Sequence, residues 1–449
     1  MHKIIILITV IATTIVFGHQ LMADNSPEYI HEVLPNGLTV IIKHNPDSRV
    51  FAIDILGKNR AAWEKPGQEG ITDFVNRMLV KGTKDKTADE IQAELDDIGA
   101  QIKTNDSPYI PYDDRYTWRA FSFVRFETID EYAKKGIKIL YEIIANPIFP
   151  EDELEKTRHK VMGILGMESG STYQVCRNLY YSKLFNNHPL STKVLGTRQS
   201  VAGFTRDDLM LHHKRYYAPG NLIMAVVSNV KPKTVLKWIK KKFGKMAPYN
   251  IKSPVMPPAS KTTGIIKTQR PMEKEQVYIY LGNIVPGLSS DYAPAIALAV
   301  EILSSRLKLN LREKQGLAYS VGAGVRFLGQ FGWYVCSMGT GYENFEIAKN
   351  GIIAEIEKLK SETIEQNELD KARNSLWGSM LMRNMSCINQ AFNMAYYEFI
   401  IEDYDYDDGY KERIDNVTVE DVQWVTQHFL DTGNYVLAYV GKVAEEDQE

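Results

Sequence analysis

The chain has 449 residues, of which 53 are lysine or arginine and 56 are aspartate or glutamate, so its formal net charge is −3. This near balance argues against a general nucleic-acid binder, which normally carries a basic excess. Hydrophobic residues make up 44% of the chain and charged residues 24%, which is ordinary globular usage and argues against disorder or a coiled coil. At roughly 150 residues per domain, the length predicts two to four domains.

The first 23 residues differ in composition from the rest of the chain. Lys3 is followed by an apolar run from Ile4 to Gly18, and a small residue, Ala23, precedes the first polar stretch. This pattern predicts a secretory signal peptide over residues 1–23. The run is shorter than the roughly 20 residues that span a bilayer, and we expect no stable membrane span after signal removal. The chain is therefore predicted to be exported, to the periplasm in the first place or outside the cell as the alternative.

The rest of the chain contains an internal sequence repeat. Thr205 and Thr418 each open a similar segment, and the Gly-Asn pairs at 220 and 433 close it at the same offset of 213 residues. A third pair of similar segments, starting at Glu153 and Glu368, has an offset of 215 residues. Three matches in the same order indicate an internal duplication.

Each repeat predicts the same local structure. Thr205 and Thr418 are N-cap candidates with an aspartate three residues later, and an apolar strand follows the helix that each begins. In the first half, residues 38–42 and 50–56 are predicted to be paired strands joined by a turn around Pro46. Each half is therefore predicted to be α+β, with a mostly antiparallel sheet and helices on one face. The halves would span residues 24–247 and 266–449, joined by a Pro- and Lys-rich linker at 248–265.

The segment from Gly70 to Thr83 is predicted to be an amphipathic helix, because its apolar residues recur at helical spacing. Asp73, Asn76 and Arg77 occupy positions i, i+3 and i+4 and share its polar face. The same spacing occurs in H-x-x-E-H, where two imidazoles one turn apart bind zinc and the glutamate acts as a base.

The helix, its Gly-Thr exit and the duplicated halves resemble the insulinase/pitrilysin family of zinc peptidases, the inverzincins. The motif of that family reads like G-x-A-H-F-L-E-H-M-L-F-K-G-T, so its two histidines fall on Asp73 and Arg77 and its glutamate base on Asn76. The third zinc ligand of the family, a glutamate, falls on Ile164. The resemblance implies a clamshell of two α+β halves in which all four chemical positions have been replaced.

These replacements predict that the chain holds no zinc and has no catalytic residue of its own. A guanidinium has no lone pair for a metal, an amide cannot act as a base, and an isoleucine cannot coordinate. Glu168 lies one helical turn beyond Ile164 but cannot bind zinc without the imidazoles. The alternative interpretation of Asp73 and Arg77 is a surface i,i+4 ion pair, or a role in an interaction.

Other metal ligands are sparse. The three cysteines, Cys176, Cys336 and Cys387, are far apart and predict neither a disulfide framework nor a thiolate metal site. No two of the nine histidines are four residues apart. A zinc site assembled from scattered residues stays open as an alternative.

The second half keeps a different part of the family pattern. Residues 311–321 match the family block L-R-E-K-x-G-L-A-Y-S-V, whose arginine and tyrosine in active relatives hold the substrate backbone and help stabilise charge on the scissile carbonyl. The resemblance implies that Arg312 and Tyr319 bind substrate. The alternative is a hydrogen-bonded arginine at a helix end and a core tyrosine, both kept for packing.

Together these features lead to a hypothesis about function. We expect an exported, non-catalytic subunit of a heteromeric zinc metallopeptidase, with zinc on a homologous partner that keeps an intact H-x-x-E-H and with a peptide or unfolded polypeptide as substrate. The alternatives are a structural or peptide-binding assembly protein with no part in proteolysis, and an autonomous peptidase with novel ligands. An insertion at residues 105–114 is longer than the usual turn of the family there and is interpreted as a lid, a partner contact or a tolerated loop.

Overall fold

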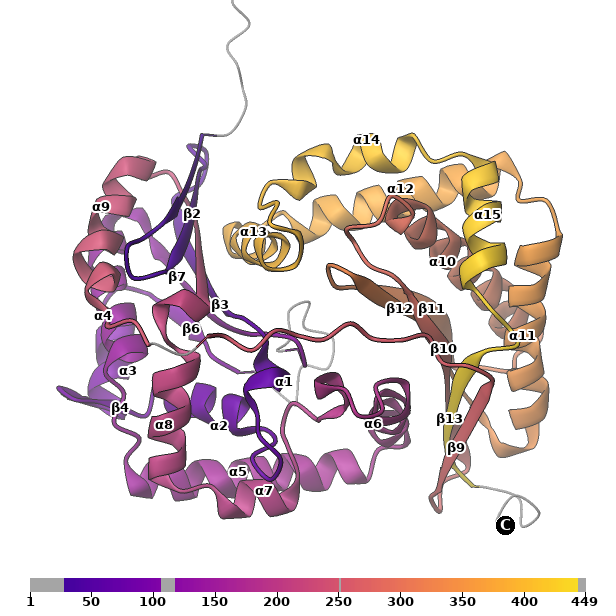
Figure 1. Cartoon of the computed structure of the whole chain (residues 1–449), viewed down its shortest axis with the longest axis horizontal. Coiled ribbons are helices and arrows are strands. Elements are labelled where there is room, and N and C mark those ends of the chain that lie inside the picture. The colour runs from indigo at the N-terminus through magenta and orange to yellow at the C-terminus, as the bar shows by residue number, and fades with distance from the viewer. Residues whose placement is uncertain (1–27, 106–117, 250–251, 443–449) are drawn as a thin grey trace, which may run out of the picture.

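The protein is described by a computed structural model that covers residues 28–105, 118–249 and 252–442. The predicted signal peptide at 1–23 lies outside these residues, as does the predicted insertion at 105–114 apart from Asn105. Two α/β layers, each built on one large sheet, face one another like the halves of a clamshell (Figure 1). No helix among the described residues is long and apolar enough to cross a membrane.

The first sheet has six strands, in the order β1 (Tyr29–Val33), β2 (Thr39–His44), β8 (Leu222–Ser228), β3 (Val50–Gly57), β7 (Ser122–Ile129) and β6 (Gln101–Lys103). A separate hairpin consists of β4 (Gly82–Thr83) and β5 (Lys86–Thr87). The helices of this half are α1 (Arg60–Trp63), α2 (Ile71–Met78), α3 (Ala88–Asp96), α4 (Ala133–Ala145), α5 (Glu151–Ser169), α6 (Thr172–Leu184), α7 (Arg198–Gly203), α8 (Arg206–Tyr216) and α9 (Pro232–Lys242).

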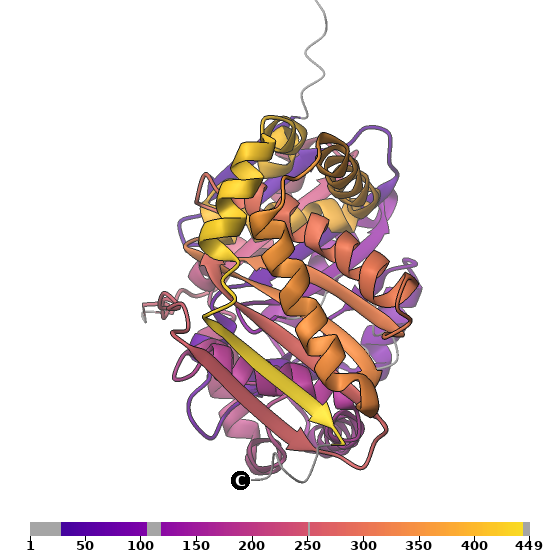
Figure 2. The ribbon, with the colours of Figure 1, turned by 90° about the vertical axis from the view of Figure 1, so that its right-hand side faces the viewer.

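The second sheet has five strands, in the order β11 (Ser320–Phe327), β12 (Phe331–Gly341), β10 (Gln276–Pro286), β13 (Tyr435–Gly441) and β9 (Ile265–Pro271). Its helices are α10 (Ala293–Leu307), α11 (Phe345–Ser361), α12 (Gln366–Arg383), α13 (Cys387–Ile401), α14 (Tyr410–Asp415) and α15 (Val419–Phe429). Helices of this half cross the outer face of the sheet (Figure 2, orange and yellow).

The two sheets share one topology, as the predicted duplication requires. The order β2-β8-β3-β7-β6 in the first sheet corresponds to β9-β13-β10-β12-β11 in the second. In both, the strand after the repeated helix (β8 or β13) lies parallel to the first strand of this shared order (β2 or β9) and antiparallel to the strand on its other side (β3 or β10). Every other pairing is antiparallel, so the predicted α+β class with antiparallel-rich sheets is confirmed.

Repeated side-chain contacts accompany the repeated topology. Thr205 and Thr418 both cap their helices, each accepting from the backbone N–H of an aspartate whose carboxylate accepts from the threonine N–H in return. Arg158 of α5 donates to the carbonyl of Phe204, immediately before the first cap. Arg373 of α12 donates to the carbonyl that immediately precedes the second cap. The third pair of similar segments therefore places an arginine in the same structural role in each half, bonded to the carbonyl just before the helix cap.

Two predictions about local structure were wrong. Residues 38–42 and 50–56 are strands, but they do not pair, because β8 lies between β2 and β3 and bonds to both. The helix predicted over 70–83 ends at Met78, because the chain turns away to pair Gly82 and Thr83 with Lys86 and Thr87. The pairing error arises because β8 is distant in sequence from β2 and β3. The helix-length error arises because the spacing of apolar residues does not indicate the turn after Met78.

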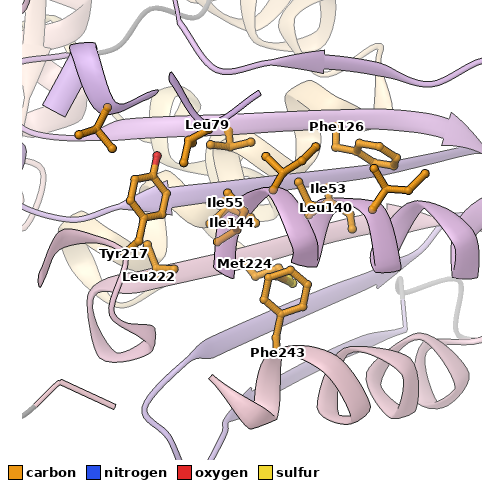
Figure 3. Close-up of a cluster of buried hydrophobic side chains, with 14 of the residues drawn as sticks. Ile53, Ile55, Leu79, Phe126, Leu140, Ile144, Tyr217, Leu222, Met224 and Phe243 are labelled. Atoms are coloured by element: carbon orange, nitrogen blue, oxygen red, sulfur yellow. The ribbon is translucent and has the colours of Figure 1, made fainter. Parts of the chain in front are cut away.

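Each sheet buries its outer face under helices of its own half. Figure 3 shows part of the first core, in which Ile53 and Ile55 of β3, Phe126 of β7 and Met224 of β8 lie against Leu140 and Ile144 of α4 and against Phe243. All of these side chains are at most 1% exposed. The second sheet packs in the same way against α10, α11 and α15. Burying such apolar side chains is the dominant favourable contribution to folding.

The inner faces of the sheets are covered by exchanged helices. Helix α13 of the second half packs on β3 and β8 of the first sheet, and α6 of the first half packs on β10 and β13 of the second. The prediction of helices on one face only was therefore incomplete. The fully buried strands β8 and β13 are almost continuously apolar, with Ser228 at the end of β8 as the exception, as is typical of strands covered on both faces.

Helix α6 is fixed to the second sheet by close polar and steric contacts. The Cys176 thiol lies 3.2 Å from the carbonyl oxygen of Tyr278, and the Tyr180 hydroxyl donates to the carbonyl of Tyr334 at 3.2 Å. A Cβ added to Gly282 of β10 would meet that same Tyr334 carbonyl oxygen at 2.0 Å and the Tyr180 hydroxyl at 2.7 Å. The approach of α6 to the sheet thus depends on a glycine at position 282.

Gly282→Ala should therefore lower the free energy of unfolding by about 3 kcal/mol or more, because backbone must move to admit one methyl group. The matched control is Gly324→Ala in β11, where an added Cβ meets no atom within 4 Å and the change should stay within about 0.5 kcal/mol. Urea unfolding of both variants measures the difference. Equal stability of the two variants would contradict the close approach.

Candidate functional site

A cavity of about 810 Å³ lies between the two halves. Its walls come from α2, α5 and α6 of the first half and from β10, β11 and β12 of the second. Of the positions singled out from the sequence, Asp73, Arg77 and Ile164 line it, and so does Glu168. The site predicted from the family motif is thus a real concave region, although its chemistry differs from that of the family.

Asp73 and Arg77 form a bidentate ion pair on α2. The Arg77 Nε donates to Asp73 Oδ2 at 2.6 Å and Nη2 to Oδ1 at 3.3 Å. The pair was expected at the surface, but the Asp73 side chain is 2% exposed and that of Arg77 11%. The i,i+4 pairing is confirmed and its surface location is wrong. Since both charges are withdrawn from water, each depends on the other.

Asn76 points away from the cavity and has a structural role. It is fully buried, its Oδ1 accepts from the Tyr217 hydroxyl at 2.6 Å, and its Nδ2 donates to the Phe123 carbonyl at 3.4 Å. Burial raises the pKa of Tyr217 well above its ordinary value. A neutral tyrosine hydroxyl and a neutral amide therefore join α2 to α8 and the first sheet where the family motif has a base.

Two buried histidines of α8 join this helix to its neighbours, His212 to α2 and His213 to α4. His212 Nε2 lies 2.9 Å from the Thr72 hydroxyl of α2, and His213 Nε2 donates to the Ile144 carbonyl at 2.9 Å. Burial lowers the pKa of His212 to about 3 and that of His213 to about 4. Both imidazoles are thus neutral, buried and engaged in packing rather than in ligation.

The zinc of the family does not fit the residues present. The Arg77 guanidinium already donates to Asp73, Asn76 is committed to Tyr217, and Ile164 has no donor atom. Within the ranges the structure describes, no three histidine, cysteine, aspartate or glutamate side chains are grouped so that they could hold a metal ion. All three cysteines are free and buried.

Glu168 is an acid in a basic neighbourhood. Burial raises its pKa, and the charge of Asp73 adds to this rise, while Arg177, Lys193 and Arg119 oppose it. Each of these five side chains lines the cavity. The sequence placed Glu168 near the site, but it gave no signal for Arg119, Arg177 or Lys193, because these residues come from separate segments with no shared motif.

Arg312 and Tyr319 are exposed residues at the entrance to β11. Arg312 lies in the π-helical turn Lys308–Glu313, and Tyr319 immediately precedes Ser320, the first residue of β11 and part of the cavity wall. Neither side chain lines the cavity itself. Tyr319 is 86% exposed, so the alternative of a core tyrosine kept for packing is wrong. No described residue accepts a hydrogen bond from the Arg312 side chain, so the alternative of an arginine satisfied at a helix end receives no support either.

The fold and this cavity define a metallopeptidase-like protein without metallopeptidase ligands. The profile "Insulinase (Peptidase family M16)" matches residues 39–198, and "Peptidase M16 inactive domain" matches residues 203–376. The chain belongs to the insulinase family, peptidase family M16, and has the fold of its inactive-type domain. Because the second profile crosses the segment between the halves, the domain boundaries at 247 and 266 stay a prediction.

Relatives and solved structures agree with this assignment. An "uncharacterized zinc protease", YmxG of Bacillus subtilis, is 25% identical over 418 residues, which is 90% of this chain and 96% of its own. The fold is that of a "peptidase M16 inactive domain" from Pseudomonas fluorescens, with a TM-score of 0.83 at 18% identity over 93% of this chain and 99% of the other. The periplasmic protease PqqL from Escherichia coli has a TM-score of 0.76 at 13% identity, over 94% of this chain and 47% of its own.

Arg77→Met should lower the free energy of unfolding by about 3 kcal/mol, because it leaves the Asp73 carboxylate buried without a partner. The double variant Asp73→Leu/Arg77→Met removes both charges and should recover most of that loss. A double-mutant cycle measured by urea unfolding gives the coupling energy. A loss for Arg77→Met below about 0.5 kcal/mol would show that the pair is as weak as a surface pair.

The buried histidines predict a loss of stability in acid. Because their pKa values are lowered by folding, the unfolded chain binds protons first as the pH falls below about 6.5, and the native state is destabilised by roughly 2 kcal/mol per imidazole at pH 5. Urea unfolding of His213→Asn should show a smaller difference between pH 8 and pH 5 than the unmodified protein. His159→Asn, at an exposed position of α5, is the control and should leave that difference unchanged; the same difference in both variants would refute the assignment.

Proposed function

We propose that this chain is an exported, non-catalytic subunit of a heteromeric zinc peptidase, in which a homologous partner with an intact H-x-x-E-H supplies the metal. The observation that carries the proposal is the contrast between the two segments that match the motifs of the family. At the metal positions, a buried Asp73–Arg77 pair replaces ligands, whereas Tyr319 of the substrate-binding block stays 86% exposed. The exposed phenol of Tyr319, and the exposed Arg312 without a described partner in the same block, are each available to a ligand or another subunit.

In this proposal, Arg312 and Tyr319 bind the backbone of a peptide or unfolded polypeptide held at the partner's zinc. A guanidinium and a phenol both donate hydrogen bonds to a carbonyl oxygen, and such donors stabilise the charge that develops there during hydrolysis. Export is supported by the composition of residues 1–23, and PqqL, which shares the fold, is described as periplasmic.

A second candidate function is peptide binding without any part in proteolysis. The observation in its favour is that the cavity lies between the two halves of this one chain and is lined by residues other than Arg312 and Tyr319. Such a chain would bind its ligand without a partner. The two candidates differ in whether the exposed arginine and tyrosine affect any hydrolysis.

The test is co-expression with a homologous chain that carries H-x-x-E-H and lies beside this one in the genome. The pair should cleave a quenched fluorescent peptide in a zinc-dependent reaction, and Arg312→Ala or Tyr319→Phe should lower kcat/KM at least tenfold, about 1.4 kcal/mol of transition-state stabilisation. Arg270→Ala and Tyr132→Phe, at other exposed positions, are matched controls.

Unchanged rates in the Arg312 and Tyr319 variants, or a pair that does not hydrolyse peptides, would favour the binding-protein alternative. Chelator-sensitive hydrolysis by this chain alone would overturn both candidates, since it would require a metal site that the residues at the family positions do not provide.

A further inference from the structure

The walls of the cavity carry an excess of positive charge. Six basic and two acidic side chains line it, a net charge of +4 when all are ionised, although the whole chain carries −3. Because the pKa of Glu168 is raised, its carboxyl group is less readily ionised, and the net charge of the cavity wall is at least as positive as this count. A concave site of one sign with aromatic walls concentrates its field on a ligand of the opposite sign.

Most of these cations have no carboxylate partner among the residues that the structure describes. Of the six, only Arg77 is held in an ion pair, with Asp73. Arg326 instead lies with its guanidinium 4.7 Å from the centre of the Trp118 ring, and Arg177 lies 5.8 Å from that of Tyr173. Stacking of this kind orients a guanidinium without neutralising it.

Arg119 adds a fixed positive charge deep in the wall. Its Nη1 donates to the carbonyls of Leu190, Ser191 and Thr192 at 3.1, 2.9 and 2.7 Å, and its Nη2 donates to Asn178 Oδ1 at 2.9 Å. Burial lowers the pKa of Arg119 to about 9; the charges of Arg177 and Arg60 lower it further, while Tyr181 and Glu168 oppose the fall. An anion that entered the cavity would add negative charge beside this guanidinium.

The cavity wall also contains a hydrogen-bond acceptor without a donor among the described residues. Gln174 lines the cavity, and its buried Oε1 has no hydrogen-bond partner among the described residues. Gln174 lies three residues before Arg177 on α6, so the two side chains emerge from the same face of that helix. A buried acceptor without a partner costs free energy that a bound N–H would recover. Inorganic anions such as phosphate offer oxygens to the arginine but little to this acceptor, whereas a peptide offers both a carboxylate and an amide.

We propose that this cavity binds acidic peptide segments, with the guanidinium of Arg177 receiving a carboxylate and Gln174 Oε1 receiving a backbone N–H of the same segment. Bidentate pairing of a guanidinium with a carboxylate is both directional and strong in a partly dry site. Tyr173, Tyr278 and Trp333 then provide the apolar walls for neighbouring side chains. The inference rests on the proposed function for its ligand class, a polypeptide, and adds the selection by charge.

The experiment titrates the full chain, without a partner subunit, with three capped peptides of equal length by isothermal calorimetry. One carries glutamate at alternate positions, one has glutamine there and one has lysine. The glutamate peptide should bind at least tenfold more tightly than the glutamine peptide, with an affinity that falls as salt is raised, and the lysine peptide should not bind. Trp118 and Trp333 line the cavity, so tryptophan fluorescence gives an independent readout.

Arg177→Met should reduce the affinity for the glutamate peptide to that for the glutamine peptide, and Gln174→Leu should weaken both peptides. Arg198→Met, which removes an exposed arginine that does not line the cavity, is the matched control and should bind as the unmodified chain does. Lys193→Met is a second cavity variant in case Arg177→Met fails to fold.

Equal binding of the glutamate and glutamine peptides, or no binding of either, would overturn the inference. Phosphate that competes with the glutamate peptide at equal concentration would also overturn it, because the site would then be a simple anion site. Because this readout needs neither zinc nor hydrolysis, it can fail while the Arg312 and Tyr319 variants still affect a peptidase pair, and the reverse also holds.

Discussion

The structure depends on the exchange of α6 and α13 between the two halves. Each large sheet has an apolar inner face as well as an apolar outer face, and a helix from the other half packs on the inner one. Neither half could expose that face to water without losing much of its hydrophobic stabilisation. The cavity follows from the same constraint, because α6 is at once the cover of the second sheet and a wall of the cavity. The first half therefore contributes Arg177 and Gln174 to a site whose opposite wall is β11 of the second half.

At the positions where the family motif binds zinc, this chain has the positive charge of Arg77. A zinc site concentrates two positive charges among neutral and anionic ligands, whereas here the Arg77 guanidinium carries the charge and Asp73 compensates it. The fold around the motif keeps its geometry because Asn76 and His212 tie α2 to α8 and the first sheet by neutral hydrogen bonds. The family helix is thus retained as a structural element whose polar motif positions are engaged with other protein groups.

Much of the fold could be predicted from the sequence, since its signals are local or periodic. The caps at Thr205 and Thr418 and the constant offset between the repeats predicted two similar α+β halves, and the structure confirms both. The pairing of β8 between β2 and β3 could not be predicted in this way, because it joins residues more than 160 positions apart and depends on the crossover rather than on the strands. The exchange of α6 and α13 between the halves could not be predicted from the sequence for a similar reason. A helix that packs on the sheet of the other half has the same apolar spacing as one that packs on its own.

The site shows the same division between local and distant signals. Asp73, Asn76 and Arg77 could be found because a known motif fixes their spacing, but their burial and their partners required the tertiary structure. Apart from Arg77, the cations of the cavity come from residues 119, 177, 193, 308 and 326, and no segment of the sequence has a basic excess that would reveal them. Lys308 and Arg326 lie on either side of the block that contains Arg312 and Tyr319. One stretch of chain therefore contributes both to the wall of the cavity and to the exposed residues next to β11. In the two proposals above, selection by charge inside the cavity and contact of Arg312 and Tyr319 with the backbone would act on one extended ligand, whether or not a partner subunit goes on to cleave it.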